Sequence, residues 1–261
     1  MQTLQLKNHI IYGPVNSRRL GRSLGINILP KEIKACTFNC AYCQYGWNQI
    51  YARPEMEMNK FNFPSAWQIS DAVSYALIKL KSEGNLPAYL TFSGNGEPSL
   101  HPEFPQIVKM IINIKNELSP ESKTAILSNS TYVHLSSVRE ALTWLDERIM
   151  KLDCGQENLF RKYNKPAHGI TLKNIIEGLE SLSSQVPVTI QTLFSSGKSG
   201  NFTKQNIARW VSIISLIKPV MVQIYSLSRG YPDLKLKPVL ADELKIVSDL
   251  LNQKGILSGV Y

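Results

Sequence analysis

Short apolar runs rich in β-branched residues alternate along this chain with longer stretches in which apolar residues recur every three or four positions. The short runs predict buried strands, and the longer stretches predict amphipathic helices. We expect the strands at residues 24–29, 88–93, 124–127, 148–152, 188–193 and 219–225. We expect the helices near residues 65–81, 105–116, 136–145, 172–182, 204–217 and 241–253.

Each predicted strand is followed by a predicted helix, and this order implies a parallel sheet with right-handed crossovers. Six strands are too few for a closed eight-stranded barrel, but they suit either an open, partial barrel or a doubly wound sheet. We therefore expect an α/β fold, a partial (β/α)6 TIM-like barrel of parallel strands with outer helices. We expect one domain over 1–261, with an N-terminal extension at 1–22, the core barrel at 23–230, and a C-terminal helix and tail at 231–261. In such folds ligands bind at the carboxyl ends of the strands.

The net charge of the chain indicates the kind of partner that it binds. The chain carries 29 Lys+Arg against 20 Asp+Glu, a formal net charge of +9. That excess favours an anionic partner, such as RNA, a nucleotide or another phosphorylated molecule, although the even spread of basic residues also fits a generally basic protein. The first ten residues have no apolar signal segment, and no apolar run approaches the ~20 residues that span a bilayer. We expect a cytoplasmic protein without a membrane partner.

Three of the four cysteines, Cys36, Cys40 and Cys43, lie within eight residues in the pattern C-x3-C-x2-C, after the first predicted strand. This spacing favours metal binding over a disulfide framework. Three thiolates are one ligand short of a four-cysteine zinc site or an ordinary four-cysteine cluster. On a [4Fe–4S] cube they would leave one iron open to a further ligand. The alternative is a zinc site completed by His101.

A glycine-rich segment, Ser93-Gly94-Asn95-Gly96-Glu97, follows the second predicted strand. Glycines there allow positive φ and a close approach of the backbone to a ligand, although a tight turn is an equal alternative. The segment lacks the Gly-Lys-Ser/Thr of a phosphate loop. Polar residues also follow the other strands, so we expect one polar mouth formed by Ser128, Asn129, Asp153, Cys154, Gln191, Tyr225 and Arg229.

The cysteine pattern, with the aromatic Tyr42 before its last cysteine, and the glycine-rich strand end together resemble the radical S-adenosylmethionine (radical SAM) superfamily. The resemblance implies that Cys36, Cys40 and Cys43 hold a [4Fe–4S] cluster whose open iron binds SAM. Reductive cleavage of SAM would give a 5′-deoxyadenosyl radical that abstracts hydrogen from a substrate. The electron donor would be a protein such as flavodoxin or ferredoxin. The SAM-binding residues would be Tyr42, Ser93, Gly94, Asn95, Gly96, Glu97, Ser128, Asn129, Asp153 and Gln191, with Glu97 accepting from the SAM ammonium.

A narrower resemblance comes from residues 13–27, 91–102, 151–155 and 225–229, which together are similar to uncharacterised Fe–S oxidoreductases related to the wyosine-forming tRNA-modification enzymes. The wyosine-forming enzymes carry extra cysteines for a second cluster. This chain has only Cys154 left over, so we do not expect a reaction that needs that cluster.

The substrate and the catalytic residues are not identified by these motifs. Cys154 is a candidate hydrogen-atom donor or radical relay, and Tyr225 is a further candidate. Arg18 and Arg19 are candidates for binding a phosphate or carboxylate of the substrate. Each also has an ordinary structural interpretation. The substrate alternatives are RNA or a nucleotide, a peptide or protein, and a small metabolite. From another class of function, a non-catalytic Fe–S redox sensor would bind the cluster without cleaving SAM.

Overall fold

A mostly parallel sheet lies at the centre of the computed structural model, which describes residues 3–48 and 61–261. Its strand order is β1-β2-β3-β4-β5-β6-β8-β10, and only β1 pairs antiparallel. The eight strands are β1 (Ile11–Ser17), β2 (Gly21–Ile26), β3 (Tyr89–Phe92), β4 (Lys123–Ser128), β5 (Glu147–Lys151), β6 (Thr189–Leu193), β8 (Met221–Tyr225) and β10 (Ser258–Val260). A separate antiparallel pair is formed by β7 (Ser195–Gly197) and β9 (Leu236–Pro238).

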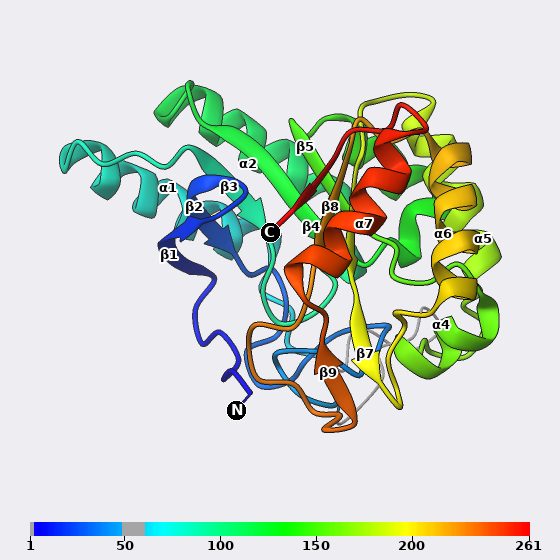
Figure 1. The fold of residues 1–261 in the computed structure, drawn as a ribbon. Coiled ribbons are helices and arrows are strands. Elements are labelled where there is room, and N and C mark those ends of the chain that lie inside the picture. Colours follow the sequence, from blue (N-terminus) through cyan, green and yellow to red (C-terminus); the bar gives the residue numbers. More distant parts are fainter. Residues whose placement is uncertain (1–2, 49–60) are drawn as a thin grey trace.

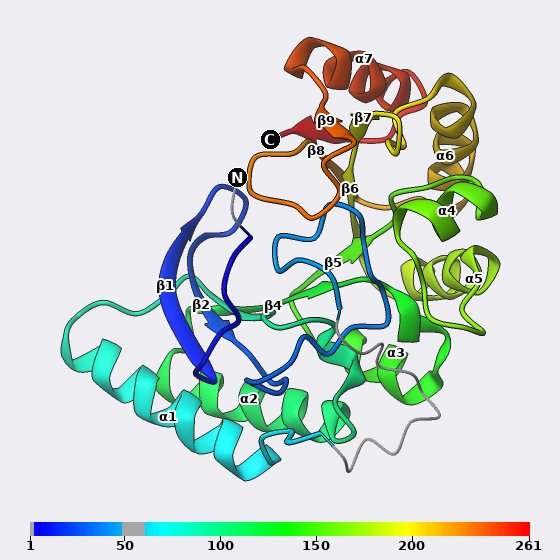
Figure 2. The ribbon, with the colours of Figure 1, turned by 90° about the horizontal axis from the view of Figure 1, so that it is seen from below.

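Helices cover the outer side of this sheet (Figure 1). Seen from below, the strands form an arc with the helices along its outside, and the loop that follows β2 crosses the inside (Figure 2). The α-helices are α1 (Ala66–Ser82), α2 (Phe104–Leu118), α3 (Ser136–Thr143), α4 (Glu157–Tyr163), α5 (Leu172–Ser183), α6 (Lys204–Ile217) and α7 (Ala241–Asn252). Short 3-10 turns η2 (Pro98–Leu100) and η3 (Thr131–His134) follow β3 and β4.

The two faces of the sheet differ in polarity because successive side chains of a strand point to opposite faces. On the outer face, Leu24 pairs with Leu90 and Ile190 with Val222, and all four belong to the buried core beneath the helices. On the inner face, one row across β5, β6, β8 and β10 reads Lys151, Gln191, Gln223 and Gly259. The apolar face therefore holds the fold together, and the polar face is left for a ligand.

Helix boundaries follow from local capping. The hydroxyl of Ser65 accepts from the Gln68 backbone N–H, and the Gln68 side chain accepts from the Ser65 N–H, which completes a capping box before α1. Thr171 and Thr203 cap α5 and α6 without the reciprocal bond, each hydroxyl accepting from a backbone N–H three residues on. Such caps satisfy N–H groups that have no partner inside the helix.

The α/β class and the six predicted parallel strands are confirmed, each with small shifts at its ends. Two further strands of the sheet lie in segments that we expected outside the core barrel. β1 lies within 1–22, and β10 lies within 231–261 and pairs with β8. Among residues 3–48 and 61–261, no helix combines the length and apolar content that crossing a bilayer requires.

Candidate functional site

The loop that carries the cysteines is anchored to the glycine-rich end of β3. Ala35 donates its N–H to the Asn95 carbonyl at 2.9 Å, and Glu97 donates its N–H to the Ala35 carbonyl at 2.9 Å. Between these bonds, Gly96 has a φ of +147°, and a Cβ there would lie 1.8 Å from the Ala35 carbonyl oxygen. Only glycine allows this approach. The backbone just before Cys36 is thereby fixed at the carboxyl end of the sheet.

All three cysteines of the loop are half-buried, and two of their sulfurs face amide donors. The side-chain amide of Asn129 lies 3.5 Å from the Cys36 sulfur, and that of Asn164 lies 3.5 Å from the Cys40 sulfur. Burial raises the pKa of the Cys36 thiol to about 12, and burial also raises the pKa of the Cys40 thiol. Without a cation to compensate them, these thiols stay protonated at neutral pH. A bound metal would displace these protons and hold the sulfurs as thiolates.

The geometry around His101 does not support the zinc alternative. Its Nε2 lies 2.9 Å from the Pro64 carbonyl oxygen, and its Nδ1 accepts from the Glu103 N–H at 3.0 Å. Both ring nitrogens are therefore used within the protein. Within the part of the chain that the structure describes, no three His, Cys, Asp or Glu side chains are arranged to hold a single metal ion.

Glu97 links the ends of β3 and β4. Its carboxylate is buried and accepts four hydrogen bonds, from the Ser99 N–H and hydroxyl, the Ser128 hydroxyl and the Asn129 N–H. Burial raises the pKa of this carboxyl, and the hydrogen bonds oppose that rise. Glu97 accepts three of these bonds through Oε1 and one through Oε2, and its expected contact with a SAM ammonium stays a prediction. Its observed role is to hold Asn129, which reaches Cys36.

We predict that Glu97→Gln destabilises the protein by about 1–3 kcal/mol, because an amide NH2 cannot accept from the Asn129 N–H and leaves that donor buried and unpaired. Urea unfolding of the purified variant measures the loss. Ser99→Ala removes one of the four donors and should cost less. Equal stability of Glu97→Gln and the unsubstituted protein would contradict this role.

The remaining residues of the glycine-rich segment pack against the N-terminal part of the chain. The Asn95 side chain is buried, donates to the Lys7 and Pro30 carbonyls at 2.9 Å, and accepts from the Lys7 N–H at 2.7 Å. Ser93 shares a 2.6 Å hydrogen bond with the Tyr12 hydroxyl. Both side chains are thus held by contacts within the protein, and their expected contacts with SAM stay predictions. Gly94, at φ +141°, packs directly on Asn27.

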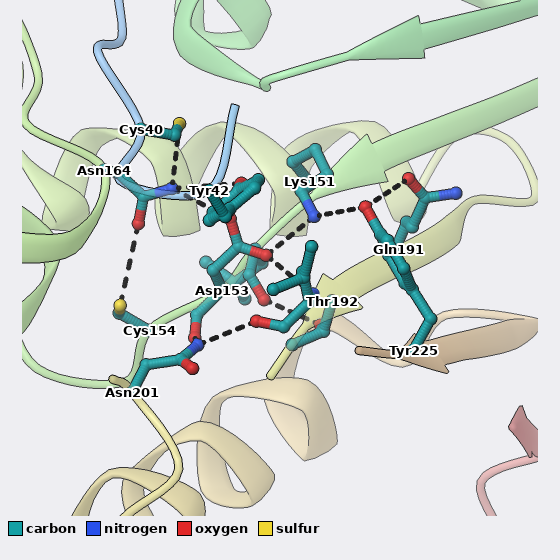
Figure 3. Close-up of polar contacts among 12 residues, drawn as sticks. Cys40, Tyr42, Lys151, Asp153, Cys154, Asn164, Gln191, Thr192, Asn201 and Tyr225 are labelled. Atoms are coloured by element: carbon teal, nitrogen blue, oxygen red, sulfur yellow. Dashed lines mark hydrogen bonds and ion pairs between the residues drawn. The ribbon is translucent and has the colours of Figure 1, made fainter. Parts of the chain in front are cut away.

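A second polar group surrounds Asp153, just after β5 (Figure 3). The buried carboxylate pairs with the Lys151 ammonium at 2.7 Å and accepts from the Asn164 amide at 2.8 Å and from the Tyr42 hydroxyl. Burial lowers the pKa of Lys151, but Asp153 and Tyr225 together raise that pKa by more, so the amine is charged. Tyr42, next to Cys43 in the sequence, is thus tied to the strand ends.

The other predicted residues fall around this group. Lys151 donates to the Tyr225 hydroxyl at 3.1 Å, and that hydroxyl donates to Oε1 of the Gln191 side chain at 3.3 Å. The Cys154 thiol is buried and lies 3.6 Å from Asn164 Oδ1, on the opposite side of Asn164 from Cys40 (Figure 3). Arg18 is exposed, whereas Arg19 reaches the Tyr225 ring.

Sequence reasoning missed Lys151 and Asn164 as members of the site. Lys151 ends β5 and could have been found by the two-residue alternation that also places Asp153 on the inner face. Asn164 follows α4, a seven-residue helix too short to show a helical period. No pattern in the sequence places its amide between Cys40, Asp153 and Cys154.

Comparison with known proteins agrees with this geometry. In sequence, the chain is 30% identical over 224 residues to the UPF0026 protein slr1464 of Synechocystis sp., covering 85% of this chain and 77% of that protein. In structure, it resembles a radical SAM methyltransferase from Sphaerobacter thermophilus with a TM-score of 0.67 and 12% identity, over 92% of this chain and 65% of that one. It also resembles TYW1 with a lysine-pyruvate adduct bound, with a TM-score of 0.61 and 16% identity, over 89% and 73% of the two chains.

At 12% and 16% identity, the two structural likenesses show the shared fold rather than a shared reaction. The family itself is shown by sequence, because residues 33–201 match the radical SAM superfamily. That stretch contains the cysteine loop, the glycine-rich end of β3 and the Asp153 group. The resemblance expected from the cysteine pattern is confirmed, and the chain belongs to the radical SAM superfamily.

Proposed function

We propose that this protein is a one-cluster radical SAM enzyme in which Cys36, Cys40 and Cys43 hold a [4Fe–4S] cluster. The observation that carries the proposal is the fixed cysteine loop, with two of its three sulfurs facing amide donors at 3.5 Å. Amide donors to cluster sulfurs tune reduction potential and are a common feature of such sites. Cys154 is buried against Asn164, so it is not a candidate for the fourth ligand.

Cys36, Cys40 and Cys43 would hold the cluster, and the reduced cluster with SAM would supply radical chemistry for hydrogen abstraction from the substrate. Residues of this chain position the cysteine loop for that chemistry. Glu97 holds Asn129, and Asn129 reaches both Cys36 and the Thr37 hydroxyl, at 3.5 and 2.9 Å. The residues that would bind SAM are Tyr42, Ser93, Gly94, Asn95, Gly96, Glu97, Ser128, Asn129, Asp153 and Gln191.

The polar inner face supports a polar substrate. Lys151, Gln191 and Gln223 lie in one row across three strands, next to the Tyr225 hydroxyl. The net charge of +9 adds support for an anionic substrate such as a nucleotide or RNA. A one-cluster enzyme would not share a reaction that needs a second cluster. A flavodoxin or ferredoxin would supply the electron, and the cytoplasm is the expected compartment.

The test is product formation from SAM. Protein reconstituted anaerobically with iron and sulfide, then given dithionite and SAM, is expected to release 5′-deoxyadenosine. The same protein without reconstitution is the control and should release none. Cluster binding without any 5′-deoxyadenosine would instead favour the redox sensor, in which the cluster is not a catalyst.

A further inference from the structure

Arg19 lies in the turn between β1 and β2, and its guanidinium reaches across to the other end of the sheet. Its Cζ lies 4.5 Å from the centre of the Tyr225 ring and 5.0 Å from the centre of the Tyr261 ring. Tyr225 ends β8, and Tyr261 follows β10, so Arg19 joins the first two strands of the sheet to the last two. Two tyrosine rings therefore hold the guanidinium in place.

Two of the three guanidinium nitrogens of Arg19 are not satisfied by the protein. Its Nε and Nη2 are buried and have no hydrogen-bond partner. Among the described residues, no carboxylate forms an ion pair with Arg19. Burial lowers the pKa of Arg19, which Tyr225 and Tyr261 oppose and the neighbouring charges of Arg18 and Arg229 reinforce. Buried donors of this kind are costly, and a native fold usually retains them for a ligand or an ordered water.

The surroundings add positive charge and hydrogen-bonding groups. The Lys151 ammonium lies 4.9 Å from the centre of the same Tyr225 ring and 5.1 Å from the centre of the Tyr42 ring. Among the described residues its carboxylate partner is Asp153, which also accepts from Tyr42 and Asn164 (Figure 3). Arg19, Tyr225, Lys151 and Tyr42 thus form a continuous series from the β1–β2 turn to the residue before Cys43.

We propose that Arg19 is the binding residue for an oxyanion, a carboxylate or a phosphate, presented by a molecule that occupies the inner face of the sheet. A guanidinium offers paired donors in a fixed fork, which is the geometry that such oxyanions accept. The proposal rests on the proposed function for its location beside the radical chemistry, and it narrows the substrate to an anionic one. The methionine carboxylate of SAM has the same chemistry, and the test distinguishes the two sources.

Thermal unfolding of the reconstituted protein measures the site with inorganic phosphate and with acetate, each against chloride at equal ionic strength. At about tenfold the dissociation constant, the bound anion should raise Tm by about 3 °C. Arg19→Gln should abolish that rise. Arg19→Lys, which keeps the charge but loses the fork, should reduce it by at least about half. Arg18→Gln removes the same charge from the exposed neighbour and should keep the rise.

The unliganded Arg19→Gln variant should melt no lower than the unsubstituted protein, because the removal of two unpaired buried nitrogens offsets the loss of the two ring contacts. A merely structural Arg19 would instead lower Tm. Equilibrium dialysis with SAM and with decarboxylated SAM identifies the source of the anion. A substrate site predicts that Arg19→Gln changes SAM affinity less than about twofold. A SAM site predicts a loss of about tenfold that decarboxylated SAM does not show.

The proposal fails if neither anion raises Tm in the unsubstituted protein and Arg19→Gln leaves SAM binding unchanged. It also fails if Arg18→Gln abolishes the rise as fully as Arg19→Gln, because the effect would then be general charge. These experiments measure the binding of anions and of SAM, and they do not depend on SAM cleavage. An absence of 5′-deoxyadenosine would therefore count against the proposed function and leave the anion site standing.

Discussion

Cys40→Ala is expected to abolish cluster assembly, so that the reconstituted variant holds almost no iron and releases at least about 100-fold less 5′-deoxyadenosine. Changes outside the ligand shell of a metal site already cost about 10–100-fold, and loss of a ligand should cost more. Cys40 also carries the sulfur that Asn164 faces at 3.5 Å, so the variant loses both a ligand and the amide contact that supports it. Iron analysis and product assay under anaerobic conditions measure the two losses.

Cys154→Ala is the matched control. This cysteine is buried and lies against the other end of the same Asn164 side chain, with its sulfur 3.6 Å from Oδ1. The same substitution there should keep the cluster and at least about half of the product, at the modest stability cost of a small buried hydrophobe. If both variants lost iron equally, Cys40 would be acting through packing and not as a ligand.

Gly96→Ala is expected to prevent cluster assembly while leaving all three cysteines in place. A Cβ at this position would lie 1.8 Å from the Ala35 carbonyl oxygen, and the backbone has a φ of +147°. The loop before Cys36 must move to relieve that overlap, which breaks the two hydrogen bonds between Ala35 and the glycine-rich segment. We expect a destabilisation of about 3 kcal/mol or more, combining strain with loss of buried hydrogen bonds. Iron content and urea unfolding are the measurements.

Gly84→Ala tests whether position, and not loss of any glycine, causes that effect. Gly84 also has a positive φ, +62°, but nothing lies within 4 Å of a Cβ placed there. It should cost about 1 kcal/mol and leave cluster assembly intact. Normal iron content in Gly96→Ala would show that the glycine-rich end of β3 does not position the cysteine loop.

The parallel strands were predictable because they are short runs rich in apolar and β-branched residues, as in Thr189–Leu193, where every residue is buried. β1 and β10 were not predicted. β1 is interrupted by Gly13-Pro14, and β10 is three residues long and contains Gly259. Strands this irregular are specified by their partners in the sheet and not by their own pattern. α4 was missed because seven residues show too little periodicity.

The candidate site was predictable where motifs are local. The cysteine spacing and the glycine-rich segment each lie within one loop, and the structure brings them together through Ala35 and Gly96. The roles of individual side chains were less accessible, because they depend on partners far away in the chain. Glu97 and Asn95 are occupied by Asn129 and Lys7, 32 and 88 residues away. Arg19 meets Tyr225 only because the sheet curves.

In the proposed enzyme, three cysteines hold a cluster with one iron left open for SAM. Electron–nuclear double resonance on the dithionite-reduced, reconstituted protein tests it directly, using SAM labelled with ¹⁵N in its amino group and ¹⁷O in its carboxylate. We predict that SAM changes the electron paramagnetic resonance spectrum of the cluster and that both labels show hyperfine coupling to it. A spectrum that saturating SAM leaves unchanged, with no coupling from either label, would contradict the account.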